Sequence, residues 1–179
     1  METVLKAQRD DEVFDVVNDR DEVVGQATRR DVHAKRLWHR AVHALVFGRD
    51  GRVFLQKRSM LKDTSPGCWD SSCSGHLDSG ESYDAAVVRE LGEEIGLTVK
   101  PENGLKALFK VEARKETGWE FVWTYQLESE GPFELHPAEV EDGAWFTQEE
   151  VTCGITERPQ QFTRSFKFIW SVRAGMASK

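Results

Sequence analysis

The chain has 179 residues, enough for one compact domain or a domain with an added arm, and its 39% hydrophobic and 31% charged content is ordinary for a folded globular protein. The net charge of −7 argues against a nucleic-acid backbone or an anionic membrane as the main partner, and no run approaches the roughly 18 apolar residues of a membrane span. The N-terminus carries no apolar signal segment, and the three cysteines, Cys68, Cys73 and Cys153, form no Cys-x-x-Cys pair. We therefore expect a reducing, cytoplasmic setting.

The first elements predicted along the chain form a β-hairpin. Apolar runs at 13–17 and 22–27 flank a short polar turn, a pattern typical of paired strands. A basic segment follows at 29–36. We predict that residues 1–36 form an N-terminal hairpin arm that packs on a main domain of residues 37–175.

The main domain is predicted to combine several strands with two helices. We expect strands at 39–47, 52–58, 105–112, 120–128 and 143–146, and helices at 82–95 and 160–174. Such a mixture favours an α/β (α+β) fold in which helices cover both faces of a mixed sheet.

The helix at 82–95 has the clearest local signals. Ser82 can cap its start, and Gly96 can take the left-handed conformation that often ends a helix. Helical spacing predicts that an apolar stripe faces the core, formed by Ala85, Val88, Leu91 and Ile95.

The same helix carries a group of acidic side chains. Glu90 and Glu94 share a face, Glu93 lies beside them, and Arg89 is in ion-pair reach of Glu93. A solvated acidic surface helix is the simpler interpretation. Gly92 favours a functional one, because glycine in a helix interior costs about 1 kcal/mol relative to alanine. Two further glycines, at 75 and 80, bracket a tight loop before the helix, and clustered carboxylates are what Mg²⁺ prefers as ligands.

The whole segment resembles the Nudix box. That pattern is a glycine, five residues, glutamate, seven residues, arginine–glutamate, an aliphatic residue, one residue, two glutamates, one residue, glycine and an aliphatic residue. Its fixed positions are filled by Gly75, Glu81, Arg89, Glu90, Leu91, Glu93, Glu94, Gly96 and Leu97. The resemblance implies the Nudix-type α/β/α sandwich with a loop–helix–loop catalytic motif, and Mg²⁺ or Mn²⁺ as the cofactor.

The resemblance also implies a role for each position of the box. Glu90 and Glu94 match the principal metal ligands, and Glu93 shares that role or orients the others. Arg89 matches the residue that holds a glutamate in place. The backbone carbonyl near Gly75 is a further candidate ligand, and the structural positions of the motif are Gly75, Glu81 and Gly96.

The implied activity is hydrolysis of a diphosphate linkage by metal-activated water, in a nucleoside diphosphate linked to another moiety or a related organic pyrophosphate. Glu94 and Glu93 are candidates for accepting the proton of the water, and Glu120 is the candidate outside the box. The substrate-binding candidates are Arg58, Trp69 and His76. Arg58 clamps a phosphate or ends a solvated strand, and Trp69 lines the pocket or packs under a loop. The expected partner is a small-molecule diphosphate, and a homodimer stays open because dimers are the commonest oligomers.

The similarity extends over most of residues 12–170 to type I isopentenyl-diphosphate isomerases and to bacterial Nudix hydrolases of that architecture. The isomerases carry a catalytic cysteine directly before the first glycine of the box. Here Ser74 holds that position, and Cys73 is displaced by one residue, which in an extended strand points its thiol to the opposite face. Ser74 and the complete acidic set favour hydrolysis over the alternative, an isomerase-like activity.

The histidines of the chain also concern the alternative of an isomerase-like activity. The isomerases bind metal through N-terminal histidines, a histidine after the box glycine and strand glutamates, and His33, His76 and Glu120 lie at matching places. His33, His39 and His43 could build a metal site, but satisfied structural histidines are the simpler interpretation because no short ligand spacing relates them. A third alternative is a catalytically silent Nudix-like domain that only binds a ligand, against which the complete box argues.

Overall fold

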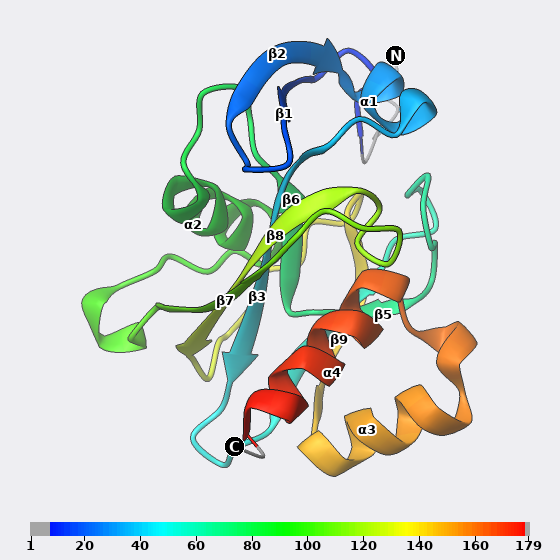
Figure 1. Ribbon diagram of the computed structural model, residues 1–179. Helices are drawn as coiled ribbons and strands as arrows, with labels where there is room; N and C mark the ends of the chain where they lie inside the picture. Colours follow the sequence, from blue (N-terminus) through cyan, green and yellow to red (C-terminus); the bar gives the residue numbers. More distant parts are fainter. Residues whose placement is uncertain (1–7, 178–179) are drawn as a thin grey trace, which may run out of the picture.

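A mixed sheet forms the centre of the structure, a computed structural model that describes residues 8–177 (Figure 1). Five strands lie in the order β5-β4-β3-β8-β7, with β6 also pairing with β3 and β9 with β4. The bounds are β3 His39–Phe47, β4 Val53–Arg58, β5 Trp69–Asp70, β6 Cys73–His76, β7 Lys106–Val111, β8 Glu120–Glu128 and β9 Val140–Phe146. Only the β3–β8 pair is parallel among the described strands, and it aligns His39 with Glu120 at its start.

Helices cover both faces of this sheet, which confirms the α/β/α sandwich (Figure 1). Helix α2 (Tyr83–Ile95) packs on one face, where Val42 and Val46 of β3 join Leu91 and Ile95 in one core cluster. Helices α3 (Gln148–Glu157) and α4 (Arg164–Ala177) cover the other face. The second core cluster contains Leu45, Phe47, Leu55, Val151, Phe166 and Trp170.

A two-stranded hairpin and a short helix lie at the end of the sheet near the start of β3 (Figure 1). The hairpin pairs β1 (Val13–Val17) with β2 (Val23–Thr28), and α1 (Arg29–Lys35) follows directly. Asp21, in the hairpin turn, accepts hydrogen bonds from Arg40 Nε at 2.6 Å and Tyr83 Oη at 2.9 Å, and it also pairs with Lys110. The turn of the hairpin therefore contacts β3, β7 and α2, and the division into an N-terminal arm and a main domain at residue 36 stays a prediction.

Helix α2 differs from its prediction in the face that it buries. Its caps are as expected, since Ser82 Oγ accepts from Ala85 N at 3.2 Å and Gly96 has a φ of 67°. Ala85 and Val88 of the predicted stripe are exposed. Their places in the core are taken by Ala86 and Val87, beside Leu91, Ile95 and the carboxyl of Glu94. The helix is turned so that Glu94 enters the interior, where polar partners bind it.

Several elements were not predicted from the sequence or begin elsewhere. Helices α1 and α3 were missed, as were the short strands β5 and β6, while β9 begins three residues earlier than expected. Residues Pro101–Asn103 and Pro159–Gln161 form 3₁₀ turns, and the second turn delays the start of α4 to Arg164. No helix within residues 8–177 is both long and apolar enough to cross a bilayer.

Candidate active site

The glutamates of α2 lie against β6, which approaches them closely because Gly75 has no side chain. A Cβ atom at Gly75 would overlap the carboxyl group of Glu90. Burial, and then the neighbouring Glu94, raise the pKa of Glu90 to about 8. A carboxyl group whose ionisation is opposed by burial and by a neighbouring carboxylate belongs to a donor set that fits a hard divalent cation, which supplies the missing positive charge.

Arg89 links the acidic residues of the motif to one another. Its Nε and Nη2 donate to the two carboxylate oxygens of Glu81 at 3.0 and 2.8 Å. Its Nη1 donates to Glu90 at 2.8 Å and to Glu93 at 3.0 Å. A further bond joins Nη2 to the backbone carbonyl of His76 at 3.0 Å. One guanidinium therefore orients three glutamates and joins the middle of α2 to β6 and to the loop before the helix.

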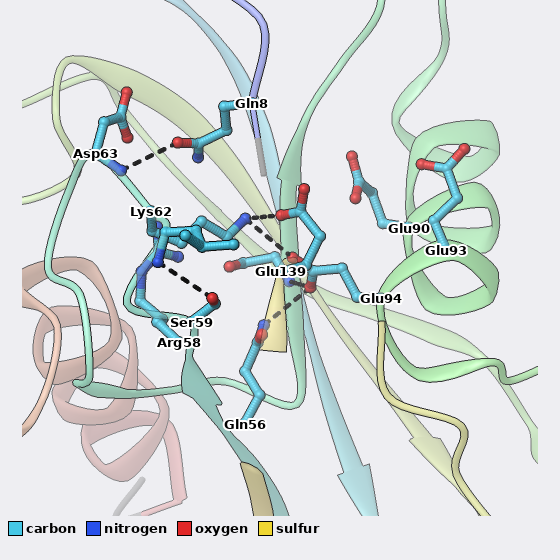
Figure 2. A network of polar contacts seen from close by, with 12 residues as sticks. Gln8, Gln56, Arg58, Ser59, Lys62, Asp63, Glu90, Glu93, Glu94 and Glu139 are labelled. Carbon is cyan, nitrogen blue, oxygen red and sulfur yellow. Dashed lines mark hydrogen bonds and ion pairs between the residues drawn. The ribbon is translucent and has the colours of Figure 1, made fainter. Parts of the chain in front are cut away.

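Glu94 is almost fully buried and is held by groups from two strands. Its Oε2 accepts hydrogen bonds from Gln56 Nε2 and from the backbone N–H of Ser74, both at 2.9 Å. Lys62 Nζ lies 3.6 Å from its Oε1 and also pairs with Glu139 (Figure 2). The sequence interpretation missed Lys62 and Glu139, which lie in the loops that lead to β5 and β9.

Glu139 brings a carboxylate to the site from outside the motif (Figure 2). Its backbone is fixed by two hydrogen bonds, because its N–H donates to His136 O at 2.9 Å and its carbonyl accepts from Ser59 N at 3.0 Å. Burial raises its pKa, and Lys62 opposes that shift. The only sequence signal for Glu139 is a loop carboxylate shortly before a strand, which is too common to select it.

A second group of potential ligands is built from α1, β3, β6 and β8. The ring nitrogens of His33, His39 and His76 lie within 4.8 Å of one another. Glu120 Oε1 lies 3.0 Å from His76 Nε2 and 3.5 Å from His39 Nε2. His43, which the sequence grouped with His33 and His39, lies outside this cluster, since its Nδ1 contacts Ser71 Oγ at 2.7 Å. The parallel register of β3 with β8 pairs His39 with Glu120 and so assembles the cluster.

Burial sets the charge of these groups. It lowers the pKa of His76 to about 3 and lowers that of His33, so both imidazoles are neutral near pH 7. Burial alone would raise the pKa of Glu120, but its contacts with His39 and His76 hold that pKa well below the usual range. Neutral imidazoles beside an ionised carboxylate are the protonation states in which these groups bind divalent metals.

The glutamates of α2, together with His76 and Glu120 of the second group, face one cavity of about 650 Å³. Its lining includes Glu90, Glu93, Glu94, His76, Glu120, Glu139, Lys62 and Arg58. Arg58 is buried and donates to Asp70 at 3.3 Å, so it is not a solvated strand end. Trp69 does not line the cavity but packs on Phe146, with ring centroids 5.0 Å apart, which favours the packing alternative over a pocket role.

The alternation of β6 separates Cys73 from Ser74. Ser74 lines the cavity, whereas Cys73 is buried in the core cluster under α2. Burial and the nearby Glu94 raise the pKa of the Cys73 thiol well above its usual range. The prediction that the thiol points to the opposite face is confirmed, and Cys73 is an unreactive core residue.

Comparisons with known proteins agree with this geometry. The model of the NUDIX domain matches residues 37–168. An uncharacterised Nudix hydrolase of Yersinia pestis is 34% identical over 150 residues, covering 82% of this chain and 79% of that protein. A protein of Photorhabdus laumondii named isopentenyl-diphosphate Delta-isomerase 2 is 32% identical over 162 residues, covering 89% of this chain and 90% of that protein.

Solved structures show the same fold. DR0079 from Deinococcus radiodurans superposes with a TM-score of 0.73 and 30% sequence identity, covering 82% of this chain and 90% of that one. A MutT protein from Methanosarcina mazei superposes with a TM-score of 0.62 at 20% identity, covering 79% of this chain and 96% of that one, which supports the fold alone. With the complete motif, its buried glutamates and these relatives, the chain belongs to the Nudix hydrolase family.

Proposed function

We propose that this Nudix hydrolase uses Mg²⁺, or Mn²⁺ in its place, to cleave the diphosphate linkage of a nucleoside diphosphate joined to another moiety, or of a related organic pyrophosphate. The observation that carries the proposal is the pair Glu90 and Glu94 on the wall of the cavity. Arg89 orients Glu90 against Gly75, and Gln56 and the Ser74 N–H hold Glu94. A solvated surface helix would not bury two carboxylates side by side.

Each residue of the site has a defined part in this proposal. Glu90 and Glu94 would hold the metal, with Glu93 and the Gly75 carbonyl as further ligands. When bound, the metal would neutralise phosphate oxygens and acidify the attacking water. Arg89 keeps the glutamates oriented, and Glu81 and Gly96 maintain the motif's shape. Substrate phosphate would be held by Arg58 and His76 at the cavity wall.

The proton of the attacking water needs an acceptor. Glu120 suits this role less than its position in the sequence suggested, because its contacts with His39 and His76 keep its pKa well below the usual range. Glu139 suits it better, because it lines the same cavity and burial raises its pKa. We therefore assign the role to Glu139, with Glu94 and Glu93 as the alternatives within the motif.

A single substrate panel with Mg²⁺ and with Mn²⁺ tests the activity. It scores phosphate and pyrophosphate release from nucleoside triphosphates, nucleotide sugars, dinucleotide polyphosphates and coenzymes. Glu90→Gln should lower kcat at least about 100-fold while circular dichroism shows an intact fold, since the variant loses a metal ligand. Glu149→Gln, on the exposed start of α3, is the matched control and should keep wild-type activity. Near-wild-type kcat in Glu90→Gln would refute the site assignment.

An isomerase-like activity is the second candidate, favoured by the cluster of His33, His39 and His76 with Glu120. Ser74 argues against it, because a hydroxyl is a far weaker proton donor near neutral pH than a thiol. The same panel should therefore include conversion of isopentenyl diphosphate. Isomerisation without any hydrolysis would overturn the hydrolase proposal, and ligand binding without turnover of any kind would point to a silent binding domain.

A further inference from the structure

A second cavity, of about 400 Å³, adjoins the first. Both are lined by Arg58, Asp70, Glu120 and Ser165, so these residues form a wall that the two cavities share. The second cavity opens between the loop from β7 to β8, residues 112–119, and the start of α4. A substrate whose diphosphate lies at the glutamates of α2 can reach it with its remaining part.

The two walls of this cavity are fixed to each other. Thr117 is buried in the β7–β8 loop, where its hydroxyl bonds to Glu120 O at 2.8 Å and accepts from Arg114 N at 3.2 Å. The guanidinium carbon of Arg114 lies 4.8 Å from the centre of the Phe168 ring on α4. The backbone of the loop is therefore anchored to the helix, and the two segments that carry the rim side chains are held next to each other.

The rim carries three cations for which residues 8–177 provide no ion-paired carboxylate. Of the charged groups lining the cavity, Arg58 pairs with Asp70, and Glu120 belongs to the histidine cluster. The rim itself holds Lys115, Arg164 and Lys167 against the single carboxylate of Glu116. Within residues 8–177, neither Lys115 nor Arg164 has a carboxylate within ion-pair distance, and Lys167 Nζ donates to the Pro159 carbonyl at 2.6 Å. In a chain of net charge −7, such a concentration of unpaired cations favours an anionic ligand.

We propose that this second cavity receives the part of the substrate beyond the scissile diphosphate, and that Lys115, Arg164 and Lys167 select substrates carrying an additional phosphate group there. The inference rests on the proposed function for placing the diphosphate in the first cavity. A phosphate group at this rim would form charge-assisted hydrogen bonds with cations that have no carboxylate partner among residues 8–177, so the added group strengthens binding.

Matched ligand pairs that differ in phosphate content test this. Isothermal titration with the Glu139→Gln variant, in the presence of Mg²⁺, slows turnover during the measurement and keeps Glu90 and Glu94 as metal ligands. The pairs are NADPH with NADH, coenzyme A with dephospho-coenzyme A, and diadenosine pentaphosphate with diadenosine triphosphate. In at least one pair, the more phosphorylated member should bind about tenfold more tightly, as expected for one or two charge-assisted hydrogen bonds.

The preference should disappear when Lys115→Gln and Arg164→Gln are added to the Glu139→Gln variant. Lys106→Gln, an exposed lysine on β7 outside both cavities, is the matched control and should preserve it. Equal affinities within every pair, absence of binding in all of them, or a preference that survives the double substitution overturns the inference. A wild-type enzyme that hydrolyses the panel without such a preference refutes this inference alone. A preference for the phosphorylated member without any hydrolysis by the wild type refutes the proposed function alone.

Discussion

Gly75 shows how one missing side chain shapes the acidic site. Its Cα faces the Glu90 carboxyl, and a Cβ atom there would overlap it. Gly75→Ala should therefore displace Glu90 and weaken Mg²⁺ binding at least about tenfold, because a preorganised ligand is lost. Titration of Mn²⁺ followed by electron paramagnetic resonance measures the affinity directly.

The matched control for Gly75→Ala is another glycine-to-alanine change, Gly92→Ala. A Cβ atom at Gly92 would meet nothing within 4 Å. This variant should keep metal affinity and gain about 1 kcal/mol of stability from the better helix former. Unchanged Mn²⁺ affinity in Gly75→Ala would show that the cradle does not position Glu90.

Glu139 allows a separate test of the proton acceptor. Glu139→Gln retains the size of the side chain but removes its basicity, so kcat should fall about 10²–10⁴-fold, the usual contribution of a general base. Mn²⁺ affinity should change much less than in Glu90→Gln. A fall in metal affinity with unchanged kcat at saturating metal would instead identify Glu139 as a ligand.

Some residues of the site could be predicted from the sequence, and others could not. Glu90, Glu94 and Arg89 could be singled out because their spacing is local to one helix. Lys62, Glu139 and the separation of His43 from His76 depend on loops and strand pairing far apart in sequence. The spacing of residues along the sequence does not indicate such contacts.

At the scale of the elements, the β1–β2 hairpin is joined to the rest of the chain by one buried carboxylate at its turn, that of Asp21. The Asp21 side chain is only 7% exposed, and its partners come from β3, β7 and α2. Burial alone would raise its pKa, but Lys110, Arg40 and Tyr83 bring the pKa below its usual value. The hairpin turn is therefore joined to three other elements through one ionised group.

Asp21→Asn should destabilise the protein by about 1–3 kcal/mol, the cost of removing one partner from charged hydrogen bonds. Asparagine tolerates the left-handed backbone at this position, where φ is 60°, so the effect reports the charge. Because the folded pKa is lowered, this stability is present above about pH 4, the unfolded value, and is lost as pH falls through the folded pKa. Urea unfolding of both proteins at pH 7 and near pH 3 measures it, and a difference that does not shrink on acidification would contradict the ionic explanation.

Helix α2 and strand β8 could be located from sequence, because caps and alternation are encoded within each segment. The face of α2 that is buried could not be predicted from the sequence. It depends on hydrogen bonds that Gln56 and the Ser74 backbone donate to Glu94 in the interior. Helix α1, with seven residues, is too short to show an apolar period.

For the whole molecule, the acidic cluster joins α2, β6 and two loops, so its charge balance affects global stability. Carboxylates of Glu90, Glu94 and Glu139 face one another in a cavity with one lysine, Lys62, among them. Mg²⁺ at 100 times its Kd should raise the free energy of unfolding by about 2.7 kcal/mol. For a chain of this length, that corresponds to a rise in Tm of roughly 5–10 °C.

Differential scanning calorimetry with Mg²⁺, and then with EDTA added in excess, measures this rise and its reversal. In Glu90→Gln the Mg²⁺-dependent rise should be much smaller. An equal rise in the variant would place the stabilising ion elsewhere, with the histidine cluster as the next candidate to test.

The pairing of β6 with β3 limits where residues can be inserted into the chain or deleted from it. Its four residues pair with β3 so that Ser74 lies opposite His43 and His76 opposite Ala41. A shift of one residue in the register of β6 on β3 would turn the Cys73 thiol to the cavity, bury Ser74 and move Gly75 away from Glu90. Insertions or deletions between Asp70 and Ser82 are therefore far more damaging than substitutions there. The loop between α2 and β7 lines neither cavity, so a change in chain length near its exposed Glu102 should leave the chemistry intact, whereas Leu97 at its start belongs to the core.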